Sequence, residues 1–83
     1  MKIRLKLFAA LRDCLPAGKT SNELELEVAD GISVQGLIEL NALPARRVHL
    51  VVVNGNHVSP SAQSGTILRD GDVVAIWPPV AGG

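Results

Sequence analysis

The sequence predicts an α+β domain in which several strands form a sheet and one main helix packs against it. Residues 2–8 and 23–28 alternate between charged and apolar side chains, as half-buried strands do. Residues 34–40 carry apolar side chains at helical spacing. Residues 48–53 and 73–77 are almost continuously apolar, which is typical of interior strands. The 83 residues suffice for one domain.

The two alternating segments carry opposite charges on their outward side chains. The outward rows are Lys2, Arg4 and Lys6 in the first segment and Glu23, Glu25 and Glu27 in the second. Antiparallel pairing would set one row against the other, and each cross-strand pair contributes about 0.2–1 kcal/mol. We therefore expect the segments to pair. The inward side chains would then be Ile3, Leu5, Leu7, Leu24, Leu26 and Val28.

A short helix is predicted over residues 9–15, ending at Pro16. Leu11, Cys14 and Leu15 have helical spacing and are expected to face the sheet edge. We expect Cys14 to be a small core residue. The alternative, a reactive thiol, needs a cationic or helix N-terminal setting, and Cys14 lies late in this segment. A single Cys excludes an internal disulfide and a zinc site built from several thiolates.

Ser33 is the predicted N-cap of the main helix over residues 34–40, and Pro44 marks its end. Gly36 costs about 1 kcal/mol relative to Ala in a helix, so packing on the sheet must hold this helix in place. Its apolar stripe would consist of Val34, Leu37 and Ile38, extended by Leu40 or Leu43.

Two turn motifs organise the second half of the chain. Asn54-Gly55 follows the apolar residues 48–53 and predicts a hairpin with a brief return strand from His57. A second tight turn at residues 70–72 leads into residues 73–77, which we expect to form the central strand because both faces are apolar.

The composition excludes several classes of function. The formal net charge is zero, so no basic excess favours nucleic acid. The first residues lack the apolar run of a signal peptide, and no segment is long enough to span a membrane. We therefore expect a cytoplasmic protein. His49 and His57 have no acidic or thiol partner at useful spacing, so surface positions are expected and a metal site is not.

The last six residues follow the predicted central strand directly. Each proline ring fixes φ, and Pro79 also restricts the residue before it, so the chain should leave the sheet at Pro78 and run extended. Gly82 and Gly83 have no Cβ and could enter a channel that any side chain would block. The carboxylate of Gly83 is an anion at neutral pH. This tail suits a reaction in which a partner enzyme grips the chain end and modifies its carboxylate.

Four segments across the whole chain resemble one protein family: residues 6–12 (KLFAALR), 53–55 (VNG), 68–74 (LRDGDVV) and 78–83 (PPVAGG). They resemble the sulfur-carrier branch of the ubiquitin-like proteins, namely the small subunit of molybdopterin synthase (MoaD) and the thiazole-pathway carrier (ThiS). The resemblance implies a β-grasp fold, with a mixed sheet of four or five strands packed against one main helix and a short helix after the first strand. The domain would span residues 1–77 and the extended tail residues 78–83.

The resemblance also implies a mechanism. A ubiquitin-activating-type enzyme would use ATP and Mg²⁺ to adenylate the carboxylate of Gly83, and a sulfur donor would convert it to a thiocarboxylate. The thiocarboxylate would enter a large synthase subunit, or another acceptor, and donate sulfur to a molybdenum or tungsten pterin cofactor. The chain itself would hold no permanent cofactor. Its partner-binding residues would be Pro78, Pro79, Val80, Ala81 and Gly82.

Three alternatives stay open. The main helix is shorter than expected for the molybdopterin carrier and residues 41–47 are compact, so the acceptor could belong to another pathway, including that of thiamine. The same activation chemistry would serve a ubiquitin-like modifier of other proteins. A binding module with an incidental Gly-Gly ending is the third. The resemblance implies that partners bind the tail and the open face of the sheet, which carries the two charged rows and apolar residues of the last strands.

Overall fold

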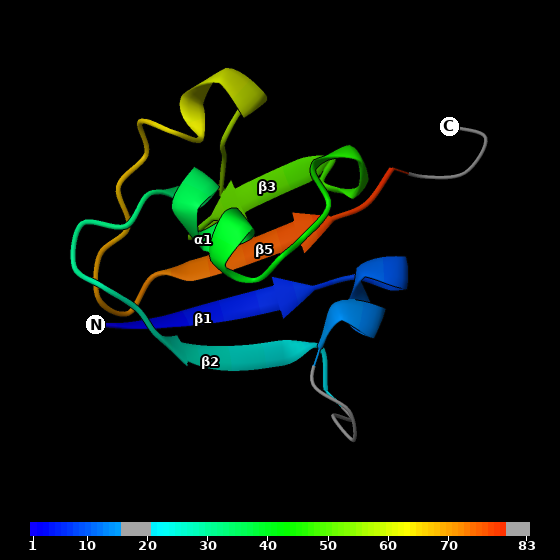
Figure 1. Ribbon diagram of the computed structural model, residues 1–83, viewed down its shortest axis with the longest axis horizontal. Helices are drawn as coiled ribbons and strands as arrows, with labels where there is room; N and C mark the ends of the chain where they lie inside the picture. The colour runs from blue at the N-terminus through cyan, green and yellow to red at the C-terminus, as the bar shows by residue number, and fades with distance from the viewer. Residues whose placement is uncertain (16–20, 80–83) are drawn as a thin grey trace.

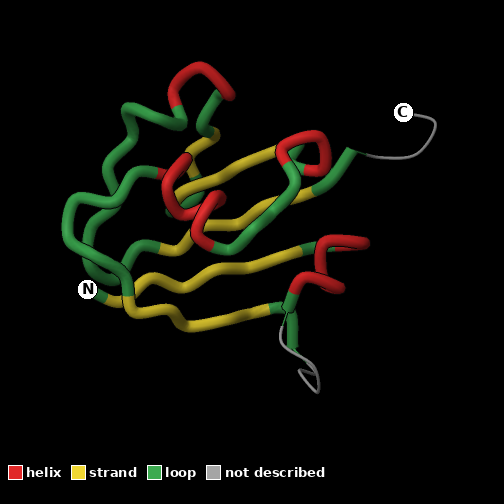
Figure 2. Tube along the Cα trace, viewed as in Figure 1, coloured by secondary structure: helices red, strands yellow, loops and turns green. Residues whose placement is uncertain are grey.

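Five strands form one mixed sheet, and α1 packs across one of its faces (Figure 1). The computed structural model describes residues 1–15 and 21–79. The sheet has the order β2-β1-β5-β3-β4. The described residues also form three 3₁₀ helices, η1 to η3 (Figure 2). The elements are β1 (Lys2–Leu7), η1 (Ala9–Cys14), β2 (Glu23–Glu27), α1 (Val34–Leu40), η2 (Ala45–Arg47), β3 (Leu50–Val53), β4 (Asn56–His57), η3 (Pro60–Ala62) and β5 (Val73–Trp77).

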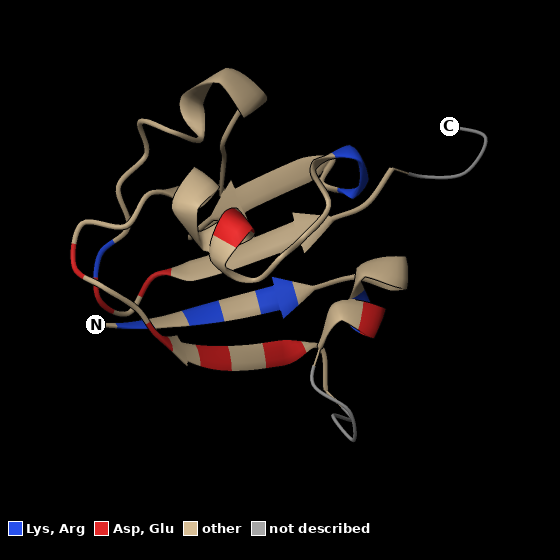
Figure 3. Cartoon of the chain, viewed as in Figure 1, with Lys and Arg blue, Asp and Glu red and all other residues tan. Residues whose placement is uncertain are grey.

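The predicted pairing of the two charged segments is confirmed. β1 and β2 are antiparallel, with Lys2 opposite Glu27 and Lys6 opposite Glu23. The basic and acidic rows therefore run side by side (Figure 3). Lys6 Nζ lies 3.3 Å from a Glu23 carboxylate oxygen. On the opposite face of β1 the apolar residues are almost completely buried, whereas Leu24 and Leu26 are half-buried because β2 is the edge strand.

β5 is the central strand, as its two apolar faces predicted. It runs parallel to β1 and antiparallel to β3. Leu5 lies beside Val74 and Leu7 beside Ile76, and these side chains share the core with α1. The alternate residues of the same strands form the open face. Each strand residue thus contributes to one of two surfaces, a buried one under α1 and an open one.

α1 covers Val34–Leu40, the residues that the sequence predicted, and ends before Pro44. The Ser33 hydroxyl accepts a hydrogen bond from the Gly36 amide at 3.0 Å and caps the helix. The helix stops at Leu40 because Asn41 caps it and Ala42 turns into the left-handed region, with φ of 54°. Of the two residues that could extend the apolar stripe, Leu43 does so. Leu40 is 62% exposed.

The prediction that Cys14 is a core residue is wrong. The segment that contains it forms η1, whose 3₁₀ hydrogen bonds include Leu11 N–H to the Phe8 carbonyl at 3.1 Å. η1 lies beyond the end of β1 rather than over the sheet (Figure 1). Leu11 turns inward and is fully buried, whereas Cys14 at the far end of the helix is exposed. The expected stop at Pro16 lies outside the described residues.

A small network of side chains fixes the start of β5. Asn54 and Gly55 both have positive φ, at 50° and 85°, which gives the tight hairpin turn that the sequence predicted. The Asn54 amide donates to an Asp72 carboxylate oxygen at 2.8 Å, and its carbonyl accepts from the Val73 amide at 2.9 Å. The second Asp72 oxygen accepts from the Arg69 amide at 2.8 Å. The β3–β4 turn is therefore tied to the turn that leads into β5.

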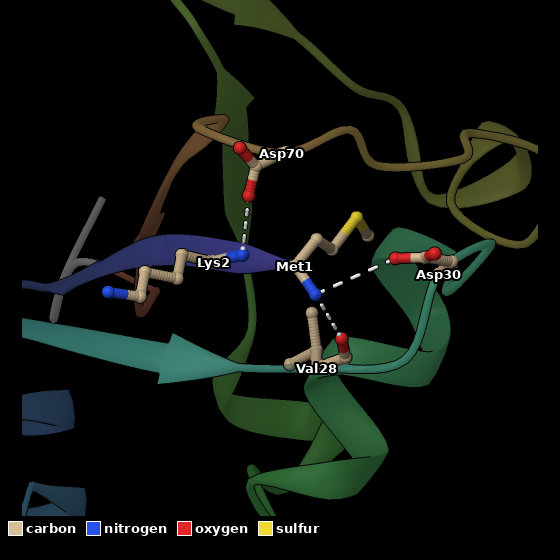
Figure 4. A network of polar contacts seen from close by, with 5 residues as sticks. All are labelled: Met1, Lys2, Val28, Asp30 and Asp70. Carbon is tan, nitrogen blue, oxygen red and sulfur yellow. Dashed lines mark hydrogen bonds and ion pairs between the residues drawn. The ribbon is translucent and has the colours of Figure 1, made fainter.

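The first residues of the chain are anchored nearby (Figure 4). The Met1 amine donates to the Val28 carbonyl at 2.9 Å and lies 3.6 Å from an Asp30 carboxylate oxygen. The Lys2 amide donates to Asp70 Oδ1 at 2.7 Å. These contacts join β1 to the end of β2 and to the turn before β5, so the ends of three strands are held together at this side of the sheet.

Substitution of Asn54 tests the turn network. Asn54→Gly tolerates the positive φ but loses both side-chain hydrogen bonds, so we expect it to lower the free energy of unfolding by about 1–2 kcal/mol. Asn54→Ala should cost about 1 kcal/mol more because Ala disfavours the left-handed region. The matched control is Asn56→Ala in the same hairpin, which should change stability by less than about 0.5 kcal/mol. Urea denaturation measures all three, and an Asn54→Gly variant as stable as the wild type would disprove the role of the network.

Candidate functional site

The chain leaves the sheet at the carboxyl end of β5, where the sequence predicted. The Trp77 carbonyl accepts a hydrogen bond from the His49 amide at 2.9 Å, and this bond lies at the end of the β3–β5 pairing. Pro78 and Pro79 follow and have no amide hydrogen to continue it. Pro78 is half-buried and Pro79 is exposed. The other predicted tail residues, Val80, Ala81, Gly82 and Gly83, lie outside the described residues.

Two aromatic rings stack beside this exit. The chain contains one Phe, one Trp and no Tyr. Phe8, directly after β1, stacks on Trp77 with 4.3 Å between ring centroids and 5° between the ring planes. The Phe8 amide donates to the Ile76 carbonyl at 3.2 Å, which continues the pairing of β1 with β5. Sequence reasoning missed this pair. The available signal was that each aromatic residue lies at the end of a predicted strand.

An apolar groove of about 560 Å³ lies against the same exit. η1 and η2 flank it, and Figure 2 shows both helices at the end of the sheet where β5 finishes. The two helices are joined by a hydrogen bond of 3.0 Å from Arg47 Nη2 to the Ala10 carbonyl. The lining residues are Ala9, Ala10, Arg46, Arg47, Trp77, Pro78 and Pro79. The sequence did not predict this groove, because it is assembled from three segments far apart in the chain.

The open face of the sheet carries the surface that the sequence predicted. The register places Val73 beside Arg4 and Ala75 beside Lys6, on the face opposite α1. Next to them, Leu50 pairs with Trp77 in β3 and β5. These apolar side chains are half-buried except Ala75, which is 9% exposed. An apolar strip along β5 and β3 therefore borders the two charged rows.

Within residues 1–15 and 21–79, no group of three or more His, Cys, Asp or Glu is placed to hold a metal ion. His49 and His57 are exposed, as expected. No helix in residues 1–15 or 21–79 is long and apolar enough to cross a membrane. The candidate site is thus an exit for the chain end, bordered by an apolar groove, an aromatic stack and the open face.

Comparison with known proteins identifies the family of this architecture. The model of the ThiS family matches residues 5–83, which is nearly the whole chain and includes Gly83. A comparison with curated proteins finds no match.

Solved structures show the same fold. A Pyrococcus furiosus protein, provisionally named molybdopterin converting factor, subunit 1, is 31% identical over 95% of this chain and 98% of its own, with a TM-score of 0.68. The small archaeal modifier protein 1 (SAMP1) of Methanosarcina acetivorans is 27% identical over 99% of this chain and 96% of its own, with a TM-score of 0.70.

A third structure is more distant. It is the complex of subunits 1 and 2 of the molybdopterin-converting factor from Helicobacter pylori. A chain of this complex is 18% identical, over 100% of both chains, with a TM-score of 0.61, so this likeness supports the fold alone. Together the comparisons confirm the ubiquitin-like β-grasp fold and the resemblance to the sulfur-carrier proteins.

A double-mutant cycle on Phe8 and Trp77 tests the aromatic stack. Phe8→Leu and Trp77→Leu keep apolar side chains at both positions but remove the stacked pair. We expect the free energies of unfolding of the two single variants and the double variant to give a coupling energy of about 0.5–1.5 kcal/mol. Chemical denaturation followed by far-UV circular dichroism measures it, because this signal does not depend on Trp77. Strictly additive effects would show that the rings lie side by side without stabilising each other.

Proposed function

Because the chain belongs to the ThiS family, we propose that it carries sulfur on the carboxylate of Gly83. The observation that supports this proposal most directly is that the family match continues through Gly83. The matched residues include the central strand β5, the two prolines that follow it and the rest of the tail. A sulfur carrier needs a chain end that projects from a stable base. β5, bonded on both sides, provides such a base.

The proposed chemistry takes place on the terminal carboxylate. One oxygen of Gly83 attacks the α-phosphate of Mg-ATP in the activating enzyme, and pyrophosphate leaves. A hydrosulfide equivalent from a sulfur donor then attacks the acyl carbon, and AMP leaves with the electron pair of the broken C–O bond. The product is a thiocarboxylate. The carrier contributes position rather than acid–base groups, because proximity is the main effect that a tethered reactant supplies.

We propose that the sulfur serves the biosynthesis of a molybdenum or tungsten pterin cofactor. The Pyrococcus furiosus structure, named as a molybdopterin converting factor subunit, supports this choice at 31% identity. The partner that accepts the sulfur would then be a large synthase subunit. The Helicobacter pylori structure contains both subunits of such a factor in one complex. The tail of the present chain, from Pro78 to Gly83, would enter that subunit.

A ubiquitin-like protein modifier is the second candidate. It is supported by the 27% identity to a small archaeal modifier protein over almost the full length of both chains. In that case the activated carbonyl of Gly83 would form an isopeptide bond with a lysine amine of a target. The two candidates share the activation step and differ in what then happens to the acyl group. The reaction product, a thiocarboxylate or an isopeptide-linked adduct, therefore distinguishes them.

Deletion of Gly83 tests the proposal. The intact mass of the wild-type chain, incubated with a ubiquitin-activating-type enzyme, Mg-ATP and sulfide, should rise by the difference between sulfur and oxygen. The Gly83 deletion should give no such product, because its carboxylate is withdrawn by one residue, about 3.3 Å.

The control is the urea midpoint of the truncated chain, which should equal that of the wild type because Gly83 follows the last strand. A truncated chain loaded as well as the wild type would refute the assignment of Gly83. Adducts with target proteins in place of a thiocarboxylate would favour the modifier.

A further inference from the structure

We infer that the apolar groove beside Pro78 and Pro79 is a docking site for the activating enzyme. Its occupant would be an apolar side chain on an acidic segment of that enzyme. The inference rests on the proposed function, since it names the surface by which the enzyme that adenylates Gly83 recognises this chain. It goes beyond the tail because the recognition elements lie on η1 and η2.

The position of the groove requires that this enzyme reach it. Pro78 and Pro79 form part of its wall and are also the first residues of the tail. Only four residues follow Pro79. They extend at most about 14 Å. A nucleotide pocket that holds the carboxylate of Gly83 must therefore lie within that distance of the groove. The enzyme surface around such a pocket then lies close enough to contact the groove.

The groove has the size and lining of a protein-docking site. Its volume of about 560 Å³ accommodates one or two large side chains. The side chains of Ala9, Ala10 and Trp77 and the two proline rings give it an apolar lining. Interfaces between proteins bury such apolar centres inside a polar rim, and Arg is enriched there. Arg46 and Arg47 supply the charge that this groove presents.

The charge of the groove indicates the chemistry of the partner. Among the described residues that line it, the charged ones are the two arginines. Arg47 is engaged by the Ala10 carbonyl, but Arg46 is exposed and meets no carboxylate within residues 1–15 and 21–79. Figure 3 shows the basic residues of η2 at the end of the sheet, apart from the paired rows of β1 and β2. A segment with Asp or Glu beside its apolar anchor is the complementary partner.

Reversal of one charge provides the test. The rate of ATP–pyrophosphate exchange is measured against carrier concentration, with a ubiquitin-activating-type enzyme from the organism that makes this chain. Arg46→Glu should raise KM for the carrier about tenfold, because like charges then face each other across the interface. It should leave kcat unchanged, because the proposed contact of Arg46 binds the folded domain and takes no part in the reaction of the carboxylate.

Arg69→Glu is the matched control. It makes the same change in net charge, and Arg69 is exposed in the turn that precedes β5, at the end of the strand opposite the groove. KM should stay at the wild-type value. High salt should raise the KM of the wild type and lower that of Arg46→Glu, because it screens the attraction in the first case and the repulsion in the second. A second variant, Ala10→Glu, places a carboxylate in the groove and leaves Arg46 unsubstituted, and it should also raise KM.

The outcomes separate this inference from the proposed function. If the wild type is adenylated and Arg46→Glu and Arg69→Glu have the same KM, the docking site is refuted and the carrier function stands. An unchanged KM for Ala10→Glu would likewise overturn the groove as the contact. A wild-type chain that is not adenylated would overturn the proposed function, and this inference with it.

Discussion

The structure depends on the bonding of β5 on both sides up to its last residue. β1 holds it in a parallel ladder and β3 in an antiparallel one. A shift of one residue would break both ladders and would exchange the core face of the strand with the open face. The Asn54–Asp72 contact fixes the same strand at its start. The point at which the chain leaves the sheet is therefore set by the whole sheet, and the two prolines prevent the ladder from continuing past it.

The zero net charge conceals an uneven distribution of charge. The acidic row of β2 is matched by the basic row of β1, and ion pairs join the two strands at Lys6–Glu23 and Lys2–Glu25. The three basic and three acidic side chains of these rows cancel in net charge, so this part of the surface attracts a charged partner only weakly. The arginines of η2 stand apart from it, on the other side of β5 (Figure 3). A composition count cannot show this separation, because only the fold decides which charges lie together.

Local patterns in the sequence predicted most of the fold. Alternation over residues 2–8 and 23–28 predicted the β1–β2 pair, the apolar run at the end predicted the central strand, and Asn54-Gly55 predicted the hairpin turn. Each of these signals lies within one segment or in the charge match between two. The exposure of Cys14 could not be predicted in this way, since it depends on where η1 lies relative to the sheet and not on spacing within η1.

The candidate site divides in the same manner. Its exit at Pro78 was predictable because proline chemistry is local. Its surroundings were not, because the Phe8–Trp77 stack and the groove join residues that are distant in sequence.

This difference between the tail and its surroundings bears on specificity. Under the proposed function, a tail that ends in Gly-Gly would offer an activating enzyme few side chains to distinguish. The distinction between one carrier and another would then rest on the folded surface around the exit at Pro78, and the exposed arginine of η2 lies on that surface.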